Sequence, residues 1–183
     1  MMTQTAESVL VVIDIQQKLA TAMPKGVRDR VVGEVNTLST AADVLQIPVL
    51  VTEQYPKGLG QTEPALTSQL PANSQIIEKT AFSCAKVPEF MQALTATGRK
   101  QVILTGMETH ICVLQTAIDL RQAGFEVFVV EDAVSSRLKG NQYNALHRMR
   151  LAGVVITNVE SVLFEWLGDA QHPNFKTLAR LIQ

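Results

Sequence analysis

Short, continuously apolar runs alternate along the chain with longer stretches in which apolar side chains recur at helical spacing. Continuous runs are typical of strands that are buried on both faces of a parallel sheet, whereas a half-exposed strand alternates apolar and polar residues. The runs predict six strands, at residues 9–13, 48–52, 75–78, 102–105, 127–130 and 154–157. The intervening stretches predict helices at residues 27–45, 87–97, 109–123 and 141–152, and further helical segments close the chain.

This alternation predicts an α/β fold with three layers, in which a six-stranded parallel sheet lies between two layers of helices. The 183 residues contain no internal repeat and suit a single domain over residues 1–183. In open parallel sheets, ligands bind at the carboxyl ends of the strands, where the strand order reverses. The residues that directly follow the strands are therefore the first candidates for function.

Three chemically active side chains follow three of the predicted strands. Asp14 ends the first strand, Lys79 ends the third, and Cys112 lies at the start of the helix after the fourth. Unpaired N–H groups and a partial positive charge at a helix start favour a thiolate, and so does a nearby lysine. We therefore expect Cys112 to be a nucleophile with a lowered pKa, although the charge of Asp14 opposes that shift. We also expect the three side chains to meet in one cleft.

Each of these residues also has a simpler interpretation. Asp14 could cap a turn or pair with a surface base, and a lysine after a strand is usually solvated. A free cysteine is most often a small buried apolar residue. We assign that role, or the lining of a pocket, to Cys84.

The remaining motifs disfavour metal and nucleotide binding. The histidines, His110, His147 and His172, have neither HxH nor HExxH spacing, so no metal site is expected. We expect His110 to point away from the thiol and the other two to be structural. No GxGxxG follows the first strand and no GxxxxGK[ST] occurs, so no nucleotide cofactor is expected.

Composition narrows the partners and the compartment. A net charge of −1 without a dense Lys/Arg run gives no support for a nucleic-acid partner. The chain contains no apolar stretch of 18 residues, so no membrane span is predicted. Residues 1–8 have neither a basic region nor an apolar segment typical of secretion. Two cysteines do not resemble a disulfide framework, so a reducing cytoplasm is expected.

Three segments of the chain resemble the isochorismatase-like (cysteine) hydrolase family, in the branch of the isochorismatase domain-containing proteins. They are Val11–Gln16, Glu78–Ser83 and Gly106–Val113, of which the last is the most specific. The resemblance extends over essentially the whole chain. It implies a six-stranded parallel sheet.

The same resemblance implies the roles of individual residues. It places an Asp-Lys-Cys catalytic triad at Asp14, Lys79 and Cys112. It also implies a cis peptide bond between Met107 and Glu108, and an oxyanion hole formed by the backbone N–H groups of Glu108 and Cys112.

Two branches of the family differ from this chain. Nicotinamidases share the triad but add an Asp-x-His…His metal site after the second strand. Here that region is Thr52–Pro56, and no histidine precedes His110, so the usual metal site cannot form. True isochorismatases lack the thiol, and the presence of Cys112 therefore favours acyl chemistry.

The sequence thus predicts a metal-independent hydrolase that cleaves a C–N bond in a small amide-like substrate through a thioester acyl-enzyme. The residues expected to line the substrate pocket are Leu19, Tyr55, Phe82 and Thr109. Alternatives are nicotinamidase-like or isochorismatase-like activity, an inactive binding or scaffolding subunit, and a redox-sensing thiol that would need Cys84 close by.

The resemblance and the 46% hydrophobic composition also predict a homo-oligomer. The expected contact is in the C-terminal half, around Val162, Leu163, Phe164 and Trp166.

Overall fold

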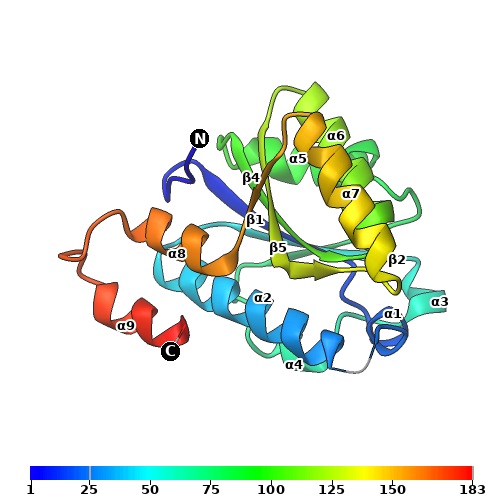
Figure 1. The fold of residues 1–183 in the computed structure, drawn as a ribbon, viewed down its shortest axis with the longest axis horizontal. Coiled ribbons are helices and arrows are strands. Elements are labelled where there is room, and N and C mark those ends of the chain that lie inside the picture. Colours follow the sequence, from blue (N-terminus) through cyan, green and yellow to red (C-terminus); the bar gives the residue numbers. More distant parts are fainter. Residues whose placement is uncertain (25, 183) are drawn as a thin grey trace.

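The computed structural model describes residues 1–24 and 26–182, and it contains a parallel six-stranded sheet with helices on both sides (Figure 1). The strand order is β3-β2-β1-β4-β5-β6. The strands are β1 (Ser8–Ile13), β2 (Val49–Gln54), β3 (Gln75–Lys79), β4 (Gln101–Met107), β5 (Glu126–Ser135) and β6 (Val155–Thr157). The predicted three-layer α/β/α fold is confirmed.

Helices α2, α8 and α9 lie on one side of the sheet, and α5, α6 and α7 lie on the other (Figure 1). The α-helices are α1 (Gln17–Thr21), α2 (Val27–Val44), α3 (Pro56–Leu59), α4 (Pro64–Thr67), α5 (Pro88–Ala96), α6 (Leu114–Gln122), α7 (Lys139–Leu151), α8 (Val159–Leu167) and α9 (Phe175–Ala179). Helical turns of other types in the described residues are η1 (Cys84–Lys86), η2 (Thr109–Val113) and η3 (Arg180–Ile182).

Strand β1 explains why the apolar runs are continuous. Leu10 and Val12 belong to the core beneath α2 and α8, whereas Val9, Val11 and Ile13 belong to the core beneath α5, α6 and α7. All five side chains are fully buried. Because successive side chains of a strand point to opposite faces, a strand covered on both sides needs an apolar residue at every position.

Two features of the fold were not predicted. Strand β5 continues to Ser135, five residues beyond its expected end, past a register shift in its pairing with β4 between Leu104 and Gly106. Helices α3 and α4 are single turns within the predicted loops, and Pro56 and Pro64 occupy their first turns. Segments this short carry no periodic apolar pattern, so the sequence did not indicate them.

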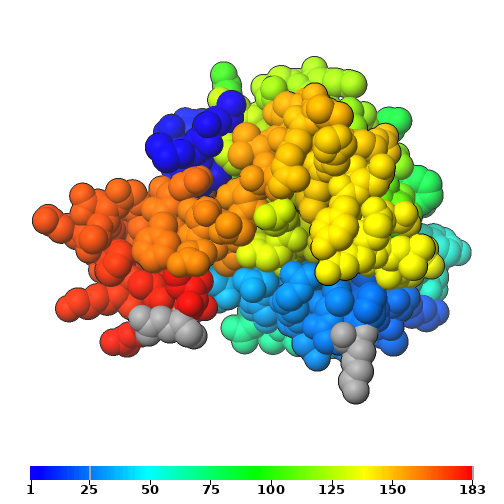
Figure 2. Space-filling view, in the orientation of Figure 1, coloured from blue at the N-terminus to red at the C-terminus, as the bar shows by residue number. Residues whose placement is uncertain are grey.

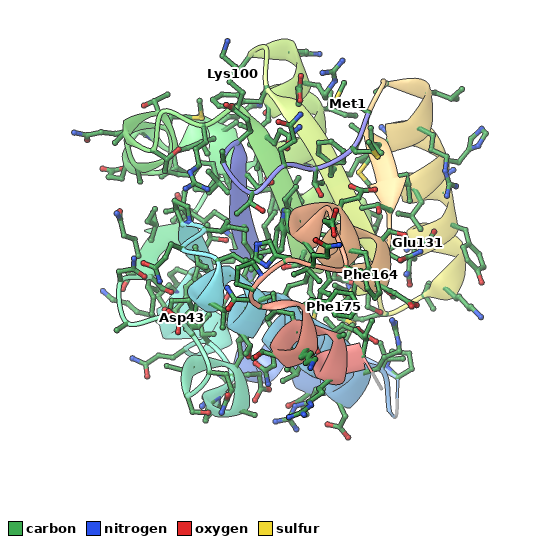
Figure 3. The ribbon with its side chains drawn as sticks, turned by 90° about the vertical axis from the view of Figure 1, so that its left-hand side faces the viewer. Met1, Asp43, Lys100, Glu131, Phe164 and Phe175 are labelled. Atoms are coloured by element: carbon green, nitrogen blue, oxygen red, sulfur yellow. The ribbon has the colours of Figure 1, made fainter. Side chains whose placement is uncertain are left out.

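The predicted contact surface on α8 is wrong for three of its four residues. Val162, Leu163 and Trp166 lie in the core of the chain itself, and the Trp166 indole N–H donates to Ser8 Oγ at 3.0 Å. Only Phe164 is exposed, at 39%, and its ring packs near that of Phe175, as Figure 3 shows. The apolar side of α8 packs on the sheet and is therefore not available to a second copy of the chain.

The N-terminal segment is attached to the same helix. Thr3 donates from its backbone N–H and from its hydroxyl to Glu165 Oε2, at 2.6 and 2.8 Å, and the Thr5 hydroxyl donates to the Trp166 carbonyl at 2.7 Å. In Figure 2 this segment, in blue, lies against the orange residues of α8. Within the described part of the chain, none of the helices is long and apolar enough to cross a membrane.

The strand order reverses between β1 and β4, because the chain adds strands on one side of β1 and then on the other. The carboxyl ends of these two adjacent strands lead directly to Asp14 and to the segment that carries Cys112. A crevice at such a reversal is the usual ligand site of an open parallel sheet.

Candidate active site

A buried ion pair forms the base of the site. Lys79 Nζ, at the end of β3, donates to Asp14 Oδ2 at 2.7 Å, and both side chains are fully buried. The other carboxylate oxygen of Asp14 accepts a 2.7 Å hydrogen bond from the Thr52 hydroxyl of β2. Asp14 and Cys112 line the same cavity, close enough for the charge of Asp14 to raise the pKa of the thiol. The structure therefore brings the three predicted residues together.

Lys79 has acceptors on several sides. Besides Asp14, its ammonium donates to Gln54 Oε1 at 2.7 Å and to the carbonyl oxygens of Ala81 and Phe82 at 3.2 and 3.1 Å. A buried ammonium is costly unless it is paired and hydrogen-bonded, and these four acceptors meet that requirement. Lys79 is thus held in one position beneath Asp14.

Two unusual backbone positions bring Asp14 and the thiol segment close together. Asp14 has a left-handed φ of 52°, a conformation that aspartate tolerates better than most residues, and its N–H donates to the Thr52 carbonyl at 3.1 Å. Gly106 has a φ of 117°, and a Cβ at this position would lie 2.0 Å from the Ile13 carbonyl oxygen. Only glycine allows β4 to pass so close to the end of β1.

The sequence predicted the thiol on the first turn of an α-helix. In the structure it lies on an irregular turn instead. Residues 109–113 form the π-helical turn η2, and α6 begins only at Leu114. The backbone N–H groups of Ile111 and Val113 both donate to the Glu108 carbonyl, at 3.0 and 3.4 Å. The peptide bond between Met107 and Glu108 is cis.

The predicted lowering of the Cys112 pKa is wrong. Burial raises the pKa of this thiol above its ordinary value of 9.0, and the charge of Asp14 raises it further, while Lys79 opposes the shift only in part. The free-energy cost of removing water from a thiolate at this position exceeds the stabilisation that the turn and the lysine provide. The resting cleft therefore holds a protonated thiol.

The two partners of the thiol are shifted as well. Burial raises the pKa of Asp14 above 3.8, although Lys79 and Thr52 lower it in part. Burial lowers the pKa of Lys79, but the negative charge of Asp14 and its hydrogen bond with the ammonium raise it, and this pKa lies above 10.5. Asp14 is thus a stronger base than an exposed aspartate, placed beside a thiol that holds a proton.

A small cavity of about 100 Å³ opens on the thiol. Its lining residues are Asp14, Leu19, Gln54, Leu59, Phe82, Glu108, Ile111 and Cys112. Leu19 and Phe82 were predicted as pocket residues. Gln54, Leu59 and Ile111 were not predicted, although Gln54 ends β2 just as Lys79 ends β3.

The other two predicted pocket residues lie elsewhere. Tyr55 has a left-handed φ of 38° and is 56% exposed, on a larger neighbouring hollow of about 490 Å³. Thr109 is fully buried and does not line the cavity. Its position at the beginning of η2 turns the side chain into the protein, a detail that depends on the path of the turn and not on sequence spacing.

Polar contacts from the segment after β5 and from α7 hold the segment that carries the thiol. The Glu108 carboxylate accepts from the backbone N–H of Arg137 at 2.9 Å and from its Nε at 3.1 Å. His110 contacts Ser136 Oγ through Nδ1 at 2.9 Å and Asn141 through Nε2 at 3.3 Å. These contacts confirm that His110 points away from the thiol.

The other two histidines lie away from the cleft. His147 is exposed on α7, and His172 Nδ1 accepts from the backbone N–H of Asn174 at 3.1 Å. Over residues 1–24 and 26–182, no group of three or more His, Cys, Asp and Glu side chains is arranged to hold a metal ion.

Comparison with known proteins agrees with this geometry. Residues 8–161 match the model of the isochorismatase domain. The chain is 41% identical to the secreted isochorismatase effector Isc1 of Phytophthora sojae, over 96% of this chain and 84% of that protein.

Two solved structures are similar over nearly the whole chain. The MAR1 ribonuclease from Caenorhabditis elegans superposes with a TM-score of 0.93 at 39% identity, covering 100% of this chain and 92% of that one. The YcaC gene product from Escherichia coli, described as an octameric hydrolase of unknown specificity, gives 0.91 at 26% identity, covering 99% and 89%. The protein belongs to the isochorismatase-like family of hydrolases.

Proposed function

We propose that this protein hydrolyses a small amide-like substrate without a metal ion, with Asp14, Lys79 and Cys112 as its catalytic triad. The observation that carries the proposal is geometric: Lys79 Nζ donates to Asp14 at 2.7 Å, and Asp14 and the Cys112 thiol line one cavity that a small molecule can enter. A nucleophile, its proton acceptor and a group that orients the acceptor are the parts that covalent catalysis needs.

Acylation begins with the protonated thiol. Asp14 takes the proton of Cys112 while the sulfur attacks the substrate carbonyl carbon, and the carbonyl oxygen gains a negative charge. Asp14 then gives the proton to the leaving nitrogen, the C–N bond breaks, and the amine or ammonia departs. A thioester between the acyl group and Cys112 remains. The raised pKa of Asp14 suits both transfers, because a carboxyl that is easily protonated is the better base and later the available acid.

Deacylation reverses these roles. Asp14 accepts a proton from water as the water oxygen attacks the thioester carbonyl. The C–S bond breaks, the carboxylic acid forms, and the proton on Asp14 returns to the sulfur. The backbone N–H groups of Glu108 and Cys112 are the proposed donors to the oxyanion in both halves, and each such donor contributes about 3–4 kcal/mol in comparable enzymes.

The role proposed for Lys79 is positional and electrostatic. Its four hydrogen bonds fix the ammonium beneath Asp14, and its positive charge lowers the pKa of that carboxyl in part, against the larger effect of burial. It does not line the cavity, so we assign it no contact with the substrate. The predicted substrate contacts of Tyr55 and Thr109 are replaced in the proposal by Gln54, Leu59 and Ile111, which do line it.

Other activities fit this site less well. A nicotinamidase-like metal site has no histidines in the Thr52–Pro56 region, and isochorismatase-like chemistry needs no thiol. The MAR1 neighbour is named a ribonuclease. Phosphodiester binding is disfavoured here because Asp14 and Glu108 place two carboxyl groups on the cavity wall. A scaffolding role would leave the buried polar cluster without a purpose, although such clusters are costly to build.

The deciding experiment measures ammonia release from a panel of small amides by the wild-type protein and by Cys112→Ala. We expect turnover by the wild type and none by the variant. Thiol alkylation, read by mass spectrometry, provides the second measurement, in which Cys112 should react faster than Cys84. Metal chelation should leave the rate unchanged. Equal turnover by both proteins, or RNA cleavage that survives the substitution, would contradict the proposal.

We also propose that the protein works as a homo-oligomer in a reducing compartment such as the cytoplasm. The octameric YcaC neighbour supports the first point, and the free state of both cysteines supports the second. Because Val162, Leu163 and Trp166 are buried, only Phe164 of the residues first predicted is available for the contact surface. Sedimentation of the protein at micromolar concentration tests assembly, and a clean monomer would refute it.

A further inference from the structure

We infer that the acyl part of the substrate is neutral, aliphatic and short, with about three or four carbons. This inference rests on the proposed function, because it describes what the cavity beside Cys112 accepts. Three properties of that cavity carry it: its volume, the residues that wall it, and the charges around it.

The volume limits the length of the acyl group. The cavity measures about 100 Å³. A cavity of roughly 150 Å³ holds benzene, which has six heavy atoms, so this one holds about four. A propanoyl group, with three carbons and one oxygen, fills it. A pyridine ring with its carbonyl group has eight heavy atoms and does not fit.

The apolar part of the wall comes from four separate segments. Leu19 belongs to α1, Leu59 to α3, Phe82 to the loop after β3, and Ile111 to η2. Figure 1 shows α1 and α3 together at one end of the sheet. An alkyl chain placed among these four side chains exchanges contact with water for contact with hydrocarbon, which favours binding.

The charges around the cavity disfavour an anionic acyl group. Asp14 and Glu108 both contribute to its wall. The two nearby cations are already engaged, since Lys79 has four acceptors and Arg137 donates to the Glu108 carboxylate. Among the described residues, no Lys, Arg or His lines the cavity. A carboxylate entering here would lose its water and meet two like charges.

The charge component is tested with acrylamide and acrylate, which have the same shape and differ in charge. In each reaction the Cys112 sulfur adds to the terminal vinyl carbon and a proton is taken up by the carbon next to the carbonyl group. The protein carries Cys84→Ser so that only Cys112 is labelled, and mass spectrometry follows the rates. Each rate is divided by that of 2-mercaptoethanol, which removes the intrinsic difference between the reagents. We expect acrylamide to be favoured at least tenfold after this correction.

The size component is tested by hydrolysis of propanamide, butanamide and hexanamide, together with succinamate and nicotinamide. The first two should be hydrolysed at least tenfold faster than the others. Leu59→Ala and Leu19→Ala should each shift the optimum toward hexanamide, because they enlarge the cavity from different helices. Leu151→Ala is the matched control, since Leu151 is 77% exposed on α7 and should leave the profile unchanged.

The outcomes distinguish failure of the inference about the acyl group from failure of the proposed hydrolase activity. Hydrolysis of succinamate or hexanamide as fast as butanamide, or equal corrected labelling by the two reagents, would overturn the inference and leave the proposed hydrolase intact. Failure to hydrolyse any amide, together with labelling of Cys112 in the wild type no faster than of Cys84, would overturn both.

Discussion

Cys84 and Cys112 are both free, buried thiols in the same core, on the side of the sheet covered by α5, α6 and α7. Cys84 is fully enclosed, its backbone N–H donates to Thr116 Oγ1 at 2.9 Å, and its Sγ lies 3.8 Å from Thr52 Oγ1. Cys112 is 5% exposed and lines the cavity together with Asp14. Of two thiols near the Asp14 carboxylate, Cys84 is therefore enclosed by protein and Cys112 is open to the cavity.

Acidity does not favour Cys112 as the reactive thiol, because its pKa is raised further than that of Cys84. Burial raises the pKa of Cys84 to about 11 and raises that of Cys112 as well. What separates them is access to a small molecule and a base on the same cavity wall. For a buried thiol, the proton acceptor beside it matters more than the stability of the free thiolate, because the proton can leave in the same step as the attack.

The largest expected effect is the difference between two alanine substitutions. Cys112→Ala should lower kcat/KM for a substrate amide by at least about 10³-fold, because no nucleophile remains. Cys84→Ala should change it by less than about fivefold, since that thiol touches no part of the cavity. Steady-state ammonia release measures both, and similar losses in the two variants would remove the distinction between the thiols.

The second prediction concerns the base. Asp14→Asn should lower kcat by roughly 10²–10⁴-fold, the usual range for a general base, while Cys112 still reacts with an alkylating agent. In the wild type, activity should be lost as pH falls through the raised pKa of Asp14, so the acidic limb of kcat/KM should lie above pH 3.8. A pH profile that stays flat down to pH 4 would show that Asp14 is not the acceptor.

The third prediction concerns Lys79, whose positive charge acts on both thiols. Lys79→Met leaves Asp14 buried without its partner and should lower the free energy of unfolding by about 3–5 kcal/mol at neutral pH. The loss should shrink as pH falls, because a protonated Asp14 needs no cation. Urea unfolding at several pH values measures this, with Lys100→Met, at an exposed position, as the control. A deficit that stays the same at low pH would mean lost packing and not lost charge.

The fourth prediction compares reactivity directly. At pH 8, iodoacetamide should alkylate Cys112 at least about tenfold faster than Cys84 in the folded protein, since only Cys112 is reached through the cavity. Both rates should continue to rise above pH 9.0, because burial raises both pKa values. Peptide mass spectrometry resolves the two sites, and a Cys112 rate that is constant above pH 7 would restore the lowered pKa first predicted.

The smallest expected effect concerns the hydrogen bond that holds Cys84 in its enclosed position. Thr116→Val keeps the shape of the side chain but leaves the Cys84 backbone N–H without its acceptor, which should lower the free energy of unfolding by about 1–3 kcal/mol. Activity should change by less than about twofold. A large loss of activity with normal stability would link Cys84 to catalysis.

Much of the site was predictable because it depends on local patterns. A strand buried on both faces needs apolar residues throughout, so the chain displays its strands and their ends. Asp14 and Lys79 stand out because they are charged groups at those ends, and Cys112 because it follows Gly106. Gln54 was equally visible at the end of β2, and only its uncharged side chain made it less conspicuous.

The sequence by itself determined the order of strands and helices and which reactive side chains lie at the edge where parallel strands end. The tertiary structure alone decided the chemistry of that edge. It buried Asp14 and Cys112 against each other, which raised the pKa of the thiol where local position had suggested a lower one. It also closed the cavity with Leu59 from an unpredicted turn. Desolvation and enclosure arise from segments distant in the chain, so no local pattern records them.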